Sequence, residues 1–166
     1  YNGLLVSAQH RFSHQFTALA NYTLSHCLSD GDFNNDLTGP IYQDPHNRAG
    51  DRANCNFDHR HIFNLSTVVA APRFNSKMLQ AVAGGWELSG IVTAQSGGFW
   101  TVTSGRDNSL TGVSLDRPNV VGDWRTGSPT PNRWFNQAAF QPNGPGMYGN
   151  AGRSIILGPK FVNFDM

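Results

Sequence analysis

Residues 85–97 form a run of alternating polarity that is longer than the edge strand of a small domain usually is. One side is apolar or small, and the other is polar except at Ile91. The first side comprises Trp86, Leu88, Gly90, Val92 and Ala94, and the second comprises Glu87, Ser89, Thr93 and Gln95. Because successive side chains of a strand point to opposite faces, this period of two predicts a β-strand. The pattern fits a membrane-barrel strand between lipid and a wet lumen, and equally a β-sandwich with one solvated face.

The composition also favours long strands. Charged residues make up 14% of the 166-residue chain, against about a quarter in ordinary soluble domains, and hydrophobic residues only 39%. Gly, Asn, Ser, Thr and Gln take the place of charge, whereas the residues that build helical bundles are scarce. The net charge of +1 gives no electrostatic reason to expect nucleic-acid binding.

Further alternating runs predict the rest of the sheet. Residues 4–25 predict a hairpin, and strands are expected over 60–71, 85–103 and 161–166. Within 85–103 the strand either continues or pairs back on itself through 99–103, and 73–83 suits either a short helix or the start of a strand. Two long loops, 28–58 and 105–159, separate them. Loops of such length are usually functional or disordered, and long loops opposite short turns are typical of outer-membrane barrels.

Several segments, taken in order, resemble one family. They include NFDHRHIF at 56–63, GWELSG through TAQSG at 85–97, RPNVVGD at 117–123, WFNQAAF at 134–140, YGNAGR at 148–153 and GPKFVNFD at 158–165. The ordered set is similar to the C-terminal part of the barrel of TonB-dependent outer-membrane receptors. The resemblance is to the large Oar-like type that carries a carboxypeptidase-regulatory-like domain, as in acidobacteria.

The resemblance implies an all-β fold: antiparallel strands of a partial transmembrane β-barrel with long extracellular loops, in the bacterial outer membrane. It implies three partners, namely the lipid bilayer, the plug and other strands of the receptor, and the TonB complex through the N-terminal part. Such transporters have about 22 strands, and open edges in lipid are costly. We therefore expect a fragment of a nutrient receptor that does not transport alone and is not an enzyme. The nutrient could be an oligosaccharide, a peptide or a metal chelate.

The alternative function is a soluble, secreted all-β ligand-binding module, with carbohydrate as one candidate ligand. A sandwich core is bulky and rich in Val, Ile and Leu. The apolar faces here are rich in Ala, Gly, Tyr, Trp and Thr. This composition favours the barrel.

Cys27 and Cys55 lie at the two ends of the first long loop. If the flanking strands are neighbours, the two thiols can meet, and the oxidising periplasm permits a disulfide. The alternative is two unpaired thiols. Their spacing fits no zinc motif.

Two groups of residues are candidate metal ligands. Oxygen-bearing side chains recur at alternate positions of the first loop, in a pattern that suits a structural calcium ion or simply a solvated acidic turn. These are Asp30, Asp32, Asn34 and Asp36. His59 and His61 are spaced to share one strand face and could hold a transition metal, although polar residues at a barrel rim are the simpler interpretation. No other cofactor is expected.

The second loop contains the candidate ligand-binding residues Trp134, Phe135 and Phe140. We expect these rings to anchor the loop by packing beneath it, and stacking against a ligand is the alternative role. No catalytic residues are expected. Ser96 and Ser104 each precede a glycine, but no helix follows, as a nucleophile elbow would require.

Overall fold

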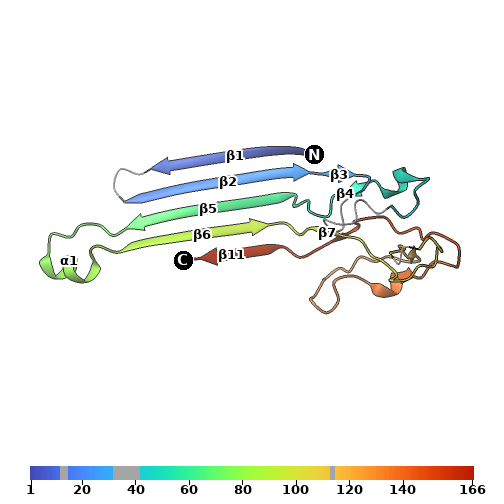
Figure 1. Ribbon diagram of the computed structural model, residues 1–166. Coiled ribbons are helices and arrows are strands. Elements are labelled where there is room, and N and C mark those ends of the chain that lie inside the picture. The colour runs from blue at the N-terminus through green and yellow to red at the C-terminus, as the bar shows by residue number, and fades with distance from the viewer. Residues whose placement is uncertain (12–14, 32–41, 113–114) are drawn as a thin grey trace. The chain divides into compact units, whose positions relative to one another are not determined.

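The computed structural model describes residues 1–11, 15–31, 42–112 and 115–166 (Figure 1). These residues form two compact units. The first, which we call the wall sheet, comprises Asn2–Ser25, His59–Gly97 and Pro159–Met166. The second, the loop unit, comprises His26–Asp58 and Gly98–Gly158 together with Tyr1.

The wall sheet contains five strands in the order β1-β2-β5-β6-β11, seen side by side in Figure 1. Their bounds are Asn2–Arg11, Phe16–His26, His61–Ala70, Glu87–Gln95 and Phe161–Asp165. The pairs β2/β5, β5/β6 and β6/β11 are antiparallel. The all-β, antiparallel prediction is therefore confirmed, and β1 and β2 are adjacent as the predicted hairpin requires.

The register separates an apolar face from a polar face, because residues paired across a sheet point to the same side. The apolar face contains the row Tyr22, Phe63, Ala94 and Val162 and the row Ala20, Leu65, Val92 and Phe164. The polar face contains the row Asn21, Asn64, Thr93 and Asn163. Within that row Thr93 Oγ1 donates to Asn64 Oδ1 at 3.2 Å. The alternation of the sequence is thus carried across four strands.

Neither face of the wall sheet is buried among the described residues. The buried hydrophobic side chains all lie in the loop unit: Cys27, Cys55, Ala139, Ala151 and Ile156. On the sheet, Leu88, Val162 and Phe164 are each more than half exposed. A β-sandwich would cover such a face with a second sheet. The wall sheet is instead one layer, and its apolar face requires apolar surroundings that the described residues do not provide.

The connection between β5 and β6 contains the helix α1, Lys77–Ala83, so this stretch is helical and does not extend the next strand. Gly85 follows with φ of 78°, a left-handed conformation that a glycine adopts without strain. Trp86 Nε1 then donates to the carbonyl of Val82 at 3.0 Å and ties the helix to the start of β6. None of the helices in the described segments is long and apolar enough to cross a membrane.

The stretch 85–103 neither continues as one strand nor pairs back on itself, which corrects both alternatives of that prediction. The wall strand β6 ends at Gln95, and β7 (Phe99–Trp100) pairs with β10 (Ile156–Leu157) in the loop unit. The chain leaves the sheet because Gly98 uses its carbonyl to accept the Gly158 N–H at 2.8 Å. Alternation beyond the glycines resembled a continued strand but belongs to a separate ladder.

The loop unit consists of short elements between irregular segments. The ladder β3/β4 joins Leu28–Ser29 to Ala53–Asn54, and β8/β9 joins Asn119–Val120 to Phe140–Gln141. Two 3-10 helices are η1, Arg48–Asp51, and η2, Gln137–Ala139. Cys27 and Cys55 form the predicted disulfide, with their Cα atoms 5.4 Å apart. The Cys55 N–H also donates to the Cys27 carbonyl at 3.1 Å.

Candidate functional site

The loop unit contains a partly open cavity of about 460 Å³. This volume lies within the range of small-molecule binding sites. Three aromatic rings line it, those of Tyr42, Phe99 and Trp100. Strand β7, which pairs with β10, supplies two of these residues, Phe99 and Trp100, whose side chains point to opposite faces of the ladder. The Trp100 ring lies over Gly158, where an added Cβ would come within 3.1 Å of it.

Uncharged polar side chains form much of the remaining wall. Four hydroxyl groups line the cavity, those of Thr101, Thr103, Thr111 and Ser154. Gln43 and Asn56 add two amide side chains to the lining. Hydroxyl and amide groups can both donate and accept hydrogen bonds. The wall therefore combines flat apolar rings with neutral hydrogen-bonding groups.

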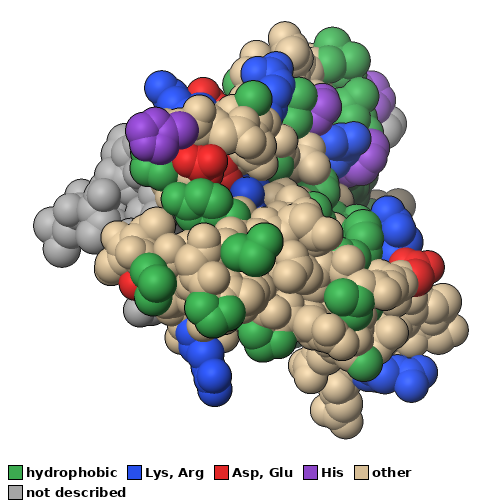
Figure 2. Space-filling model, turned by 90° about the vertical axis from the view of Figure 1, so that its right-hand side faces the viewer, with side chains coloured by type: hydrophobic (Ala, Val, Ile, Leu, Met, Phe, Trp, Pro, Cys, Tyr) green, Lys and Arg blue, Asp and Glu red, His purple; other side chains and the backbone are tan. Residues whose placement is uncertain are grey.

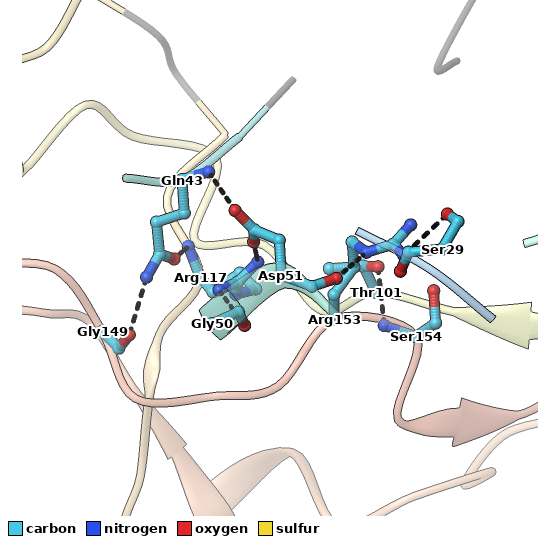
Figure 3. A network of polar contacts seen from close by, with 9 residues as sticks. All are labelled: Ser29, Gln43, Gly50, Asp51, Thr101, Arg117, Gly149, Arg153 and Ser154. Atoms are coloured by element: carbon cyan, nitrogen blue, oxygen red, sulfur yellow. Dashed lines mark hydrogen bonds and ion pairs between the residues drawn. The ribbon is translucent and has the colours of Figure 1, made fainter. Parts of the chain in front are cut away.

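A buried ion pair joins the two long loops behind this wall. Arg117 Nη1 pairs with Asp51 Oδ1, and the two residues are 8% and 1% exposed. Gln43 connects the same elements, as Figure 3 shows. Its backbone N–H donates to Asp51 Oδ2 at 3.2 Å, and its side-chain Oε1 accepts the Arg117 N–H at 2.9 Å. The pair is thus held by further hydrogen bonds, as a buried charge requires.

Arg153 links the disulfide-bonded loop to the second long loop. Its Nε donates to the Asp51 carbonyl at 2.7 Å, and its Nη2 donates to the Ser29 carbonyl (Figure 3). Nearby, Gly149 packs so closely on Arg117 that an added Cβ would lie 1.9 Å from the Arg117 carbonyl oxygen. Only glycine fits at this position. The cavity wall is therefore organised mainly by polar contacts between distant segments.

Asp116 is a second buried charge on the cavity wall. Desolvation raises the pKa of its carboxyl, but the hydrogen bonds from Ser109, Asn143 and Asn108 outweigh this and leave the pKa below its ordinary value. Ser109 donates to it through Oγ at 2.7 Å and through its backbone N–H at 2.6 Å, and Asn143 Nδ2 donates at 3.1 Å. Asp116 is therefore ionised at neutral pH.

Two buried polar atoms of the cavity wall have no hydrogen-bond partner within the described part of the chain. They are Arg117 Nε and Ser154 Oγ. In Figure 3 the backbone nitrogen of Ser154 bonds to Thr101, whereas no dashed line reaches its hydroxyl. An unsatisfied buried donor costs roughly 1–3 kcal/mol. Both atoms are closed off from solvent, so they mark unmet hydrogen-bonding capacity inside the wall and not on the surface of the cavity.

The aromatic residues singled out by the sequence lie elsewhere in the loop unit. Phe135 and Phe140 pack edge to face with ring centroids 5.7 Å apart, and Trp124 lies 6.4 Å from Phe140. Trp134 Nε1 donates to the Leu157 carbonyl at 2.6 Å. None of these rings is among the cavity-lining residues. Their contacts match the expected anchoring of the loop, and a ligand role for them stays a prediction.

Among the described residues, the predicted metal ligands do not form a group that could hold a metal ion. Asp30 pairs with Arg48 at 3.0 Å, while Asp32, Asn34 and Asp36 lie outside the described residues. Within the described ranges, no three His, Cys, Asp or Glu side chains are grouped to hold a metal ion. The calcium hypothesis accordingly stays a prediction.

The two histidines have separate partners in the wall sheet. His59 Nδ1 lies 2.7 Å from the Ser96 carbonyl, and His61 Nδ1 lies 2.8 Å from the Tyr22 hydroxyl. Each imidazole therefore has one nitrogen in a hydrogen bond. The polar interpretation of this pair accounts for both contacts without a metal.

The comparisons with known proteins identify one family. The sequence model described as "outer membrane beta barrel domain" matches residues 1–166. Neither the curated proteins nor the solved structures gave a significant match.

Proposed function

The chain belongs to the family of outer membrane beta-barrel domains, and from this premise we propose that it is part of a TonB-dependent receptor that takes up a nutrient. Family membership makes the bacterial outer membrane the location of the chain. The apolar face of the wall sheet then meets lipid, and the polar face meets the lumen. The soluble secreted module is no longer needed to explain the alternation.

The single-layer wall sheet is the observation that carries the proposal. In lipid every backbone N–H and C=O must be paired, so a spanning sheet has to close into a barrel. Here β1 and β11 are the outermost strands of the described sheet. We infer that further strands of the same receptor pair with both of them. A plugged barrel of about 22 strands supplies such partners.

The lengths of the connections indicate which ends of the strands lie outside the cell. The connections after β1 and β5, residues 12–15 and 71–86, are shorter than those after β2 and β6, which contain almost all of the loop unit. Long connections are extracellular in bacterial barrels, and short ones are periplasmic. In this proposal the loop unit meets the nutrient outside the cell, and the TonB complex acts from the periplasm. The chain then contributes binding and part of the barrel wall to the receptor, and we propose no catalytic role for it.

The proposal is tested on outer membranes extracted in detergent. Antibodies against residues 115–160 would isolate the polypeptide, whose intact mass is then compared with the 18.2 kDa of this chain. We expect a mass several times larger. We also expect the purified protein to retain the periplasmic domain of TonB on an affinity column.

Two results would contradict the receptor function. One is a polypeptide of 18.2 kDa that needs no detergent to stay in solution. The other is a large barrel that does not retain TonB and whose cells show the same nutrient uptake when the proton gradient is abolished. The second result would be consistent with a membrane barrel but would contradict a TonB-dependent receptor function.

A further inference from the structure

We propose that the cavity of the loop unit binds a neutral, hydroxyl-rich ligand of the oligosaccharide class. The inference rests on the proposed receptor function, because it names the class of nutrient that the receptor would take. It concerns Tyr42, Phe99, Trp100 and Thr103, all of which line the cavity.

The charges of the cavity wall balance. Three charged residues line it: Asp116, Arg117 and Arg153. Arg117 is neutralised by Asp51 immediately behind the wall. Arg153 and Asp116 are of opposite sign, and both are held by hydrogen bonds within the protein. An anionic ligand such as a ferric chelate would need an uncommitted cation, and the wall offers none among its described residues.

Part of the molecular surface is also largely uncharged. Figure 2 shows one face on which uncharged polar side chains and backbone cover most of the area, with Lys, Arg, Asp and Glu side chains scattered among them. The net charge of the whole chain is only +1. A surface of this kind does not concentrate charged ligands by long-range attraction. It therefore agrees with a neutral ligand.

The aromatic rings provide the apolar half of a sugar site. Sugar rings have C–H faces that carry partial positive charge, and the faces of aromatic rings are negative. The guanidinium carbon of Arg48 lies 4.8 Å from the Tyr42 ring centroid, which holds that ring in place. Phe99 and Trp100 point to opposite faces of β7, so the stacking surface consists of one of these two rings together with Tyr42. The pairing of β7 with β10 holds the strand in place.

Threonine hydroxyls provide the other half. Thr101, Thr103 and Thr111 line the cavity, and a hydroxyl can both donate and accept a hydrogen bond. Sugar hydroxyls are likewise both donors and acceptors and can bond to these groups. A wall lined only by apolar residues would leave the sugar hydroxyls unsatisfied.

The test uses the full membrane protein purified in detergent, screened on an array of neutral and acidic oligosaccharides. Affinity for the best neutral binder is then measured by calorimetric titration. We expect Trp100→Ala to weaken binding roughly three- to tenfold through loss of stacking. We expect Thr103→Val to weaken it roughly two- to tenfold through loss of one hydrogen bond. Trp86→Ala removes an equally large ring from the wall sheet and should leave binding unchanged.

Three outcomes would overturn the inference. They are no binding of any neutral oligosaccharide, stronger binding of acidic ones, and an affinity that both cavity variants leave intact. Binding of a peptide or a metal chelate at this cavity would also contradict the assignment of a sugar ligand. Uptake is measured separately. Sugar binding without TonB-dependent uptake would contradict the receptor function and support the sugar site. TonB-dependent uptake of a nutrient other than a sugar would support the receptor function and contradict the sugar site.

Discussion

Asp51 and Arg117 form the most deeply buried ion pair of the loop unit, and they come from different long loops. Burying two charges stabilises a fold only when each is fully partnered. Gln43 and the Gly50 carbonyl supply the further contacts here. At the residue scale, a buried ion pair and its hydrogen bonds therefore stabilise the loop unit. Removing one of the two charges should lower the stability of this unit.

We predict that Asp51→Ala destabilises the loop unit by roughly 3–5 kcal/mol, because it leaves Arg117 buried and unpaired. The free energy of unfolding is measured from the urea dependence of thermolysin cleavage in this unit. Asp30→Ala is the matched control, since its partner Arg48 and Asp30 itself are 56% and 50% exposed. That change should cost roughly 0–1 kcal/mol. Equal costs for the two variants would contradict the assigned roles.

Asp116 gives a pH-dependent prediction. Its pKa is lower in the folded protein than in the unfolded chain, despite desolvation, because of the hydrogen bonds from Ser109, Asn143 and Asn108. Its stabilising contribution is therefore complete above the unfolded value of about 3.9 and is lost as pH falls through the folded value. The stability difference between the wild type and Asp116→Asn should be largest near neutral pH and shrink below about pH 4. A difference that grows with acid would contradict this sign.

At the scale of elements, the connections after β2 and β5 differ in polarity and in what holds them. The connection after β2 is closed by a disulfide and packs into the polar loop unit. The connection after β5 contains α1, whose Met78 and Val82 are 81% and 71% exposed. Trp86, also 71% exposed, lies two residues before Leu88 and so on the side of the apolar face. The helix thus continues the apolar surface beyond the strand.

The disulfide should stabilise the loop unit without affecting the wall sheet. Replacing Cys27 and Cys55 by serine should cost roughly 3–4 kcal/mol for a loop of this length on the chain-entropy model. Amide hydrogen exchange is expected to rise in β3 and β4 and to stay constant in β5 and β6. Reduction of the wild type should reproduce the pattern. Unchanged exchange in β3 and β4 would show that the ladder does not depend on the bond.

The exposed side of α1 should lie in the membrane interface, where tryptophan is enriched in barrels. We expect brominated phospholipids to quench Trp86 fluorescence in reconstituted protein. The Trp86→Phe variant should lose this part of the quenching, whereas Trp124→Phe, in the loop unit, should keep it. Quenching that is the same in the wild type and Trp86→Phe would mean that the helix lies away from the bilayer.

At the scale of the whole molecule, the sequence predicted the wall better than the site. A period of two is local, so the strands and their two faces could be inferred directly from residues such as Leu88 and Ser89. The end of β6 was missed because alternation resumes after Gly98. The cavity was missed because its contacts are distant: Arg117 is 66 residues from Asp51, and Arg153 is 124 residues from Ser29. Short sequence patterns do not report contacts over such separations.

The central claim is that one face of the wall sheet meets lipid and the other meets water. Thr67 and Val68 test it most directly, because the register puts the polar residue on the apolar face, opposite Gly90, and the apolar residue on the polar face, opposite Ser89. A nitroxide spin label is attached at each position in turn in the reconstituted protein. We predict that relaxation by oxygen, which partitions into lipid, dominates at position 67 and that relaxation by a water-soluble nickel chelate dominates at position 68. Equal access of the chelate to both labels, or the reverse order, would contradict the membrane wall.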